Sequence, residues 1–172
     1  MNSRITFTLT ALVFLGLGVV FPEEAALGQQ AESTLKNQLV GTWMLASIFT
    51  NRDDGSKFDI LGLNPTGVLM FDNVDHFSVQ EMRSDLPKFG SNSRMGTEAE
   101  NKAIVRGSID YFGTYTVDEA SKTLSLHIDA CSFPNWNGTD QKRSFTLLQD
   151  ELTLSDVESS GRPVYTVWKR AK

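Results

Sequence analysis

The sequence predicts a mainly β protein, an antiparallel barrel of about eight strands with one α-helix inserted in the middle of the chain. Three observations predict this fold: short segments rich in apolar residues follow at close intervals, Asn, Asp, Gly and Pro separate them, and helical periodicity occurs in one place. Short strands at such spacing favour a sandwich or a barrel over an α/β fold. A meander of about eight antiparallel strands closes into a barrel wide enough for one small ligand.

Residues 1–28 predict a cleavable secretory signal peptide. Arg4 precedes an almost unbroken apolar run at residues 5–21, and small residues stand just before Gln29. An uncleaved anchor helix is the alternative, although a run of about 17 residues lies at the lower limit for crossing a bilayer. We therefore expect an exported protein, periplasmic or secreted, that begins at Gln29 and has no membrane insertion after cleavage.

The rest of the chain has the size of one domain. Residues 29–38 are polar and predict an N-terminal tail or a short helical turn, and residues 39–172 predict the barrel domain. A formal net charge of −5 without a Lys/Arg-rich stretch disfavours nucleic acid or an anionic membrane as the partner. Because Cys131 is the single cysteine, no internal disulfide forms and the hydrophobic core must hold the domain together.

The strands follow from alternation and from turn residues. The first predicted strand covers residues 39–50, and the Asp- and Gly-containing residues 51–56 end it with a turn. Residues 68–71 and 76–82 predict a hairpin joined through residues 72–75. Polar turns separate the strands that follow the helix. These strands are expected at residues 113–117, 123–130, 141–148, 151–154 and 164–170.

The predicted helix follows the longest loop of the chain. Residues 85–96 contain one Pro, two Gly and little periodicity, which is typical of a loop. Thr97 and Glu100 then form a capping box, with Thr97 as the N-cap and Glu100 at position N3. An apolar stripe runs from this start through Phe112, so we expect one amphipathic helix that ends at about Tyr111 and lies on or across the barrel.

Two features at the ends of the predicted barrel resemble a known family. The first strand opens with a G-x-W motif, Gly41 to Trp43, and the last strand ends at Arg170. This pattern resembles the lipocalins, in which a Trp near the start of the first strand closes one end of the barrel. The resemblance implies that Trp43 is structural and that Arg170 packs over its ring as a cation–π pair.

Further sequence blocks extend the similarity over residues 38–170. These blocks are Leu39-Val40-Gly41-Thr42-Trp43, Asn64-Pro65-Thr66-Gly67, His76-Phe77-Ser78-Val79-Gln80, Tyr111-Phe112-Gly113-Thr114-Tyr115-Thr116-Val117, Phe133-Pro134-Asn135-Trp136-Asn137-Gly138-Thr139-Asp140-Gln141-Lys142-Arg143 and Leu152-Thr153-Leu154. With them the chain resembles the bacterial and fungal family called the lipocalin-like domain. The resemblance implies a calycin-type β-barrel but little about chemistry, because this fold hosts both carriers and enzymes.

Strand alternation makes Arg143 the first candidate for a ligand-binding residue. Within the predicted strand 141–148, Arg143 shares a face with Phe145 and Leu147, which places its side chain inside the barrel. A buried guanidinium group needs an acceptor or an anion. Two interpretations remain open: Arg143 binds a carboxylate, phosphate or carbonyl group of a ligand, or it pairs with an internal Asp or Glu.

Five further residues are candidates for ligand binding. His127 alternates with the apolar residues of its strand, so it faces either solvent or, by the family resemblance, the same cavity as the buried arginine. Tyr115 is expected to face inward, and Gln80 and Arg83 are site residues by resemblance alone. Trp136 lies in a loop, where it is expected either to border the ligand site or to cap the core.

We therefore expect a binding protein for a small hydrophobic or amphipathic ligand, held in a barrel cavity with a polar pole. One alternative is a small-molecule enzyme of the isomerase, cyclase or hydrolase type that uses the same cavity. Another is a cell-envelope structural protein without a ligand. No cofactor is expected, because the sequence contains no P-loop, G-x-S-x-G or Gly-rich dinucleotide motif. Two His and one Cys leave no cluster with metal-ligand spacing, and the sequence does not define an oligomeric state.

Overall fold

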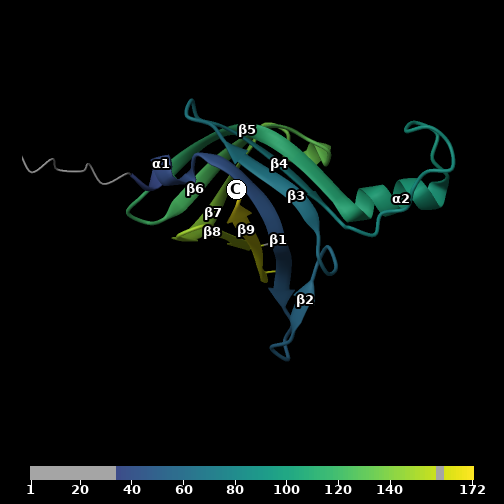
Figure 1. Cartoon of the computed structure of the whole chain (residues 1–172), viewed down its shortest axis with the longest axis horizontal. Helices are drawn as coiled ribbons and strands as arrows, with labels where there is room; N and C mark the ends of the chain where they lie inside the picture. Colours follow the sequence, from purple (N-terminus) through teal and green to yellow (C-terminus); the bar gives the residue numbers. More distant parts are fainter. Residues whose placement is uncertain (1–33, 158–160) are drawn as a thin grey trace, which may run out of the picture. The chain divides into compact units, whose positions relative to one another are not determined.

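The computed structural model describes residues 34–157 and 161–172 (Figure 1). The predicted signal peptide, residues 1–28, and residues 29–33 of the predicted tail lie outside the described residues. The last part of the predicted tail forms a short helix, α1 (Leu35–Leu39). In the described ranges, no helix is long and apolar enough to cross a lipid bilayer.

Strands in the described part of the chain form one antiparallel sheet. They are β1 (Gly41–Asn51), β2 (Lys57–Asp59), β3 (Thr66–Phe71), β4 (His76–Met82), β5 (Ser108–Asp118), β6 (Thr123–Cys131), β7 (Thr139–Leu148), β8 (Glu151–Val157) and β9 (Pro163–Arg170). From β3 to β9 each strand pairs with the next, and β1 pairs with both β3 and β9, which closes the sheet into a barrel. The short strand β2 pairs only with the end of β1. The predicted fold class, an antiparallel barrel of about eight strands with an inserted helix, is therefore confirmed.

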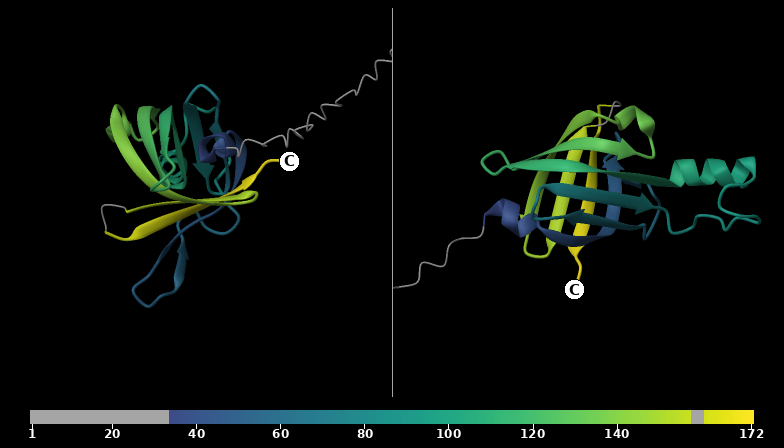
Figure 2. Two further views of the ribbon diagram at one scale, coloured as in Figure 1. Left: turned by 90° about the vertical axis from the view of Figure 1, so that its left-hand side faces the viewer. Right: turned by 90° about the horizontal axis from the view of Figure 1, so that it is seen from above.

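The inserted helix is shorter than predicted. It begins at the predicted capping box but forms only α2 (Glu98–Gly107), because residues 108–111 already belong to β5. From Ser108 onward the side chains alternate between the inside and the outside of the barrel, so Tyr111 is buried and Phe112 is exposed. The expectation that the helix lies on or across the barrel is also wrong. It extends from the start of β5 beyond the strands, and Val105 is 80% exposed (Figures 1 and 2).

One end of the barrel is closed by Trp43 and the chain that precedes it. Trp43 is fully buried, and its Nε1–H donates to the carbonyl of Leu39 at 2.8 Å. The guanidinium carbon of Arg170 lies 4.1 Å from the centroid of the Trp43 ring, a favourable cation–π distance. The same guanidinium donates to the carbonyls of Gln38 and Val40. The structure thus brings together the two residues that the resemblance pairs at this end.

Apolar side chains fill the half of the barrel next to this closed end. They point inward from alternate positions of successive strands, as the period of two requires. Each of them exposes at most 8% of its surface. These residues are Leu45, Leu69, Phe71, Phe77, Val79, Tyr115, Leu124, Leu126, Ile128, Phe145, Leu152 and Trp168.

A β-bulge separates the filled half of β5 from its other half. The pairing of β5 with β6 shifts between Phe112 and Gly113. A Cβ atom at Gly113 would lie 1.9 Å from the backbone carbonyl oxygen of His127, so the two strands approach this closely only with glycine there. Tyr115 lies on the filled side of the bulge and Tyr111 on the other.

Candidate functional site

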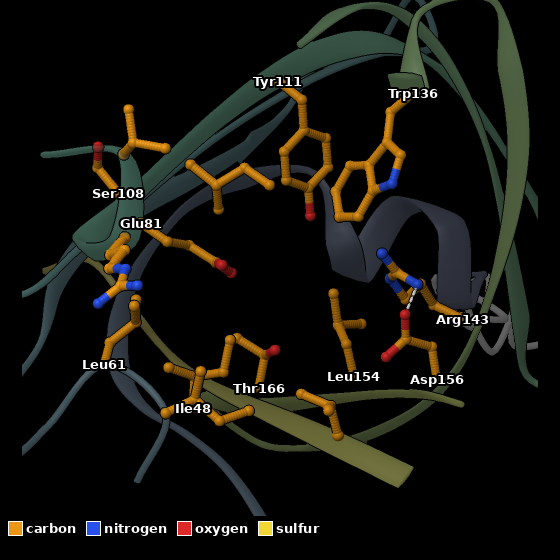
Figure 3. Close-up of a pocket in the computed structure, with 15 residues that line it drawn as sticks. Ile48, Leu61, Glu81, Ser108, Tyr111, Trp136, Arg143, Leu154, Asp156 and Thr166 are labelled. Carbon is orange, nitrogen blue, oxygen red and sulfur yellow. Dashed lines mark hydrogen bonds and ion pairs between the residues drawn. The ribbon is translucent and has the colours of Figure 1, made fainter. Parts of the chain in front are cut away.

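The end of the barrel opposite Trp43 contains a cavity of about 320 Å³ (Figure 3). Its lining comes from the ends of β1, β4 and β8 and from the starts of β5 and β9, which the antiparallel order gathers at one end. The last turn of α2 borders it. Most of the wall is apolar, formed by Ile48, Ile60, Leu61, Val105, Ile109, Leu154 and Val164. Small-molecule sites have this composition, and the volume falls at the lower end of their usual range of about 300–1,000 Å³.

Arg143 reaches this cavity from β7, on the same face of the strand as Phe145. Its side chain is 12% exposed and forms an ion pair with Asp156 on the neighbouring strand β8. A second nitrogen, Nη2, donates to Gln141 Oε1 at 2.7 Å. The arginine therefore faces inward and has a protein carboxylate as its partner, which is the second of the two interpretations that the sequence left open. Because it also lines the cavity, the same group remains accessible to a ligand.

Glu81 supplies a buried carboxyl group on the opposite wall of the cavity. It points inward from β4, in line with Phe77 and Val79, and is 5% exposed. Burial raises the pKa of Glu81 to about 7, and the negative charge of Asp110 adds to this increase while the positive charge of Arg143 opposes it. Near neutral pH this side chain can therefore either accept or give up a proton.

Tyr111 and Trp136 place aromatic rings between these polar groups. Tyr111 is buried, its hydroxyl points into the cavity, and its ring meets the ring of Trp136 edge-on at 5.6 Å (Figure 3). Burial is the main cause that raises the pKa of Tyr111, so the hydroxyl stays protonated and can donate a hydrogen bond. Trp136 belongs to a short 3₁₀ helix, η1 (Pro134–Trp136), and its carbonyl accepts a hydrogen bond from Thr139 at 2.7 Å. The loop tryptophan thus lines the cavity wall.

The predicted cavity position of His127 is wrong. Leu124, Leu126 and Ile128 occupy the inner face of β6, so the alternation places His127 on the outer face. Its side chain is 48% exposed, and Nδ1 lies 2.8 Å from a carboxylate oxygen of Asp140 on β7. This is the solvent-facing alternative that the sequence left open.

Three other predicted site residues also lie outside the cavity. Tyr115 faces inward as expected, but it is packed in the filled half, where its hydroxyl donates to the carbonyl of Asp72 at 2.9 Å. Gln80 points outward from β4 and borders a shallow hollow on the outer face. Arg83 lies beyond the end of β4 and donates two hydrogen bonds to Asp85, both at 2.8 Å. Of the predicted ligand-binding residues, only Arg143 and Trp136 therefore line the cavity, and its other polar groups are residues that the sequence analysis did not name as candidates.

The polar groups of the cavity can bind and transfer protons but do not provide a metal site. No group of His, Cys, Asp and Glu within the described residues could hold a metal ion. Glu81, Tyr111, Arg143 and Asp156 offer two carboxyl groups, one hydroxyl donor and one guanidinium around a mostly apolar space. This arrangement suits a molecule with an apolar body and a few hydrogen-bonding groups.

Replacing Arg143 with Met should lower the free energy of unfolding by about 2 kcal/mol, because it strands the carboxylate of Asp156. This value lies between those of exposed and of fully buried ion pairs, since Asp156 keeps 23% of its side chain exposed. Removing both charges, with Arg143→Met and Asp156→Leu, should recover most of the loss. Urea unfolding of the single and the double variant measures both changes in the free energy of unfolding. If Arg143→Met alone is as stable as the wild type, the ion pair does not stabilise the fold.

A closed antiparallel barrel with one end plugged by a tryptophan and a cavity at the other defines a protein of the lipocalin-like class. The chain belongs to the lipocalin-like domain family, whose model matches residues 40–171. The match spans the barrel from the residue before β1 to the residue after β9.

Several known proteins are similar to this chain. The 4'-hydroxy-3'-methoxypropiophenone carrier protein ppsC of Aspergillus oryzae is 33% identical over 87 residues, which are 46% of this chain and 78% of that protein. Among solved structures, a redesigned β-barrel has 15% identity and a TM-score of 0.42, covering 81% of this chain and 100% of its own. A second redesigned β-barrel, bound to DFHBI, has 17% identity and a TM-score of 0.40, covering 78% of this chain and 97% of its own.

Proposed function

We propose that this protein is a carrier that binds one small molecule, with an apolar body and hydroxyl or carbonyl groups, in the barrel cavity. The observation that carries the proposal is the cavity of about 320 Å³, with apolar walls and a few polar side chains. A structural protein without a ligand would have this end of the barrel packed like the other. Membership in the lipocalin-like family and the name of the Aspergillus relative as a carrier protein support the proposal.

The charges around the cavity favour an uncharged ligand over an anion. Asp156 already neutralises Arg143, and Arg106, which also lines the cavity, balances Glu81 when it ionises near neutral pH. A carboxylate ligand would therefore add an uncompensated negative charge to a cavity whose charges are already balanced. The compound in the name of the relative is an aryl ketone with hydroxyl and methoxy groups. We propose the same chemical class, phenolic aryl ketones, for this chain.

We expect 4'-hydroxy-3'-methoxypropiophenone to bind at one site, with saturable heat in isothermal titration calorimetry at about pH 7, where its phenol is mostly protonated and Glu81 is partly ionised. Because Trp136 lines the cavity, binding should also quench its fluorescence, whereas Trp43 and Trp168 lie in the filled half. A Trp136→Phe variant should lose most of the quenching and keep the binding heat.

A matched ligand tests the expected preference for an uncharged group. The carboxylate analogue 4-hydroxy-3-methoxybenzoate should bind about tenfold more weakly than the ketone, a difference of about 1.4 kcal/mol. Absence of saturable heat with the ketone would contradict the carrier function. Tighter binding of the carboxylate would contradict the proposed preference.

We also propose that the protein is exported. The apolar run at residues 5–21, with Arg4 before it and small residues before Gln29, supports this proposal. When the full chain is expressed in a secreting host, the product outside the cytoplasm should begin near Gln29, as determined by intact mass and N-terminal sequencing. An exported product that retains Met1 would contradict cleavage.

A further inference from the structure

We propose that Glu81, Tyr111 and Arg143 form an acid–base site that moves a proton at the carbon next to a carbonyl group of the bound ligand. The protein would then catalyse enolisation as well as bind its ligand. This inference rests on the proposed binding of a carbonyl compound in the cavity, and it adds a reaction to it.

The position of Glu81 has no structural explanation. Its side chain is buried and points into the cavity, and its carboxyl group forms no hydrogen bond with any described residue (Figure 3). The positive charge that acts on Glu81, Arg143, is paired with Asp156, and Arg83, two residues further along the chain, is paired with Asp85. A buried carboxyl group without a partner destabilises a fold, whereas an apolar residue at this position would extend the core. Such a group is available to a ligand in the cavity.

The surroundings of Glu81 make it a base suited to neutral pH. Burial raises its pKa to about 7, with Asp110 on β5 adding to this effect and Arg143 on β7 opposing it. Asp156 on β8 and Arg106 on α2 also line the cavity, so the charges that face Glu81 largely compensate one another. A general base is most effective when its pKa lies near the working pH, because it is then ionised and still takes up a proton readily.

Tyr111 and Arg143 are placed to stabilise an enolate oxygen. The Tyr111 hydroxyl and the Arg143 guanidinium both point into the cavity that Glu81 faces (Figure 3). Asp156 and Gln141 hold the guanidinium in place, so these donors need little reorganisation when negative charge develops on the ligand. Preorganised donors of this kind, in a space with apolar walls, stabilise a developing oxyanion.

The proposed step needs no co-reactant. The ionised Glu81 carboxylate removes a proton from the carbon next to the carbonyl group. The electron pair of that C–H bond forms a C=C bond, and the π pair of the C=O bond moves to the oxygen, which accepts hydrogen bonds from Tyr111 and Arg143. The protonated Glu81 then returns a proton to the same carbon, which exchanges its hydrogen, or to a conjugated carbon, which isomerises the ligand.

The test uses propiophenone as the probe and follows the exchange of its α-hydrogens for deuterium in D₂O by ¹H NMR. The wild-type protein should exchange them at least about 100-fold faster than buffer, with a rate that saturates in propiophenone and rises with pH to a plateau above the pKa of Glu81. Glu81→Gln, which keeps the shape and cannot accept the proton, should lose about 10²–10⁴-fold. Tyr111→Phe should lose about 10–10³-fold, because it removes one oxyanion donor.

Calorimetry of the same proteins with propiophenone separates binding from exchange. Glu151→Gln, the same substitution at an exposed residue of β8, should exchange like the wild type. If the wild type binds propiophenone and exchanges it no faster than buffer, the acid–base site is overturned and the carrier function stands. Full exchange by Glu81→Gln would also overturn it. If the wild type does not bind propiophenone, the carrier function fails for this class and the inference fails with it.

Discussion

Replacing Trp43 with Ala should lower the free energy of unfolding by about 3–5 kcal/mol, the range for truncation of a buried aromatic side chain. Trp43 is fully buried, and its indole N–H donates to the carbonyl of Leu39 at 2.8 Å. Alanine would leave a cavity between the filled half of the barrel and α1, and the guanidinium of Arg170 would lose the ring over which it lies. Urea unfolding followed by circular dichroism measures the loss.

Two further variants show whether the loss of stability arises because Trp43 closes this end of the barrel. Phe112→Ala removes an aromatic ring from the outer face, where Phe112 is 53% exposed, and should change the stability by less than about 0.5 kcal/mol. Arg170→Met keeps an apolar stem over the indole, removes the cation and should cost about 1 kcal/mol. A loss below about 1 kcal/mol for Trp43→Ala would mean that the tryptophan does not close the barrel.

The fold could be predicted because its signals are local. The hairpin through residues 72–75, the capping box at Thr97 and the strand alternation depend on residues that are close in sequence. The sequence does not predict where α2 ends, because residues 108–111 fit a helical stripe as well as a strand. These residues form a strand because they pair with β4 and β6, and such pairing cannot be seen in a single segment of the sequence.

The site could be predicted only in part, because its partners come together through closure of the barrel. Alternation alone places Arg143 inside, but Asp156 lies beyond the predicted strand 151–154, because β8 continues to Val157. Alternation also places Glu81 on the inner face with Val79. The apolar stripe predicts that Tyr111 ends the helix, and it therefore does not reveal the inward position of Tyr111 on β5. The sequence of β6 shows that His127 lies on the opposite face from its apolar residues, but it does not show which face lies inside the barrel. Only the closure of the barrel defines this.

The stability of the protein should decrease as the pH rises from about 4.5 to above 7, relative to a Glu81→Gln variant. The ordinary pKa of a Glu side chain, which applies to the unfolded chain, is 4.5, whereas the pKa of Glu81 is about 7 in the folded protein. The folded state therefore holds this proton more tightly than the unfolded state does. Below pH 4.5 the carboxyl group is protonated in both states and resembles the amide of Gln. Above pH 7 folding requires a buried charge, which costs about 3 kcal/mol at 1.36 kcal/mol for each pKa unit.

The comparison of variants isolates Glu81 from the other titrating groups. Asp72, Asp85 and Asp118 are exposed carboxylates whose hydrogen bonds lower the pKa, so both proteins lose their contributions equally as the pH falls. Urea unfolding across this range should therefore show Glu81→Gln gaining about 3 kcal/mol over the wild type, whereas Glu151→Gln should stay parallel to it. A difference that does not change with pH would mean that the Glu81 carboxyl group is solvated in the folded protein. It would then be too acidic to serve as a base near neutral pH, and the proposed enolisation would lose its proton acceptor.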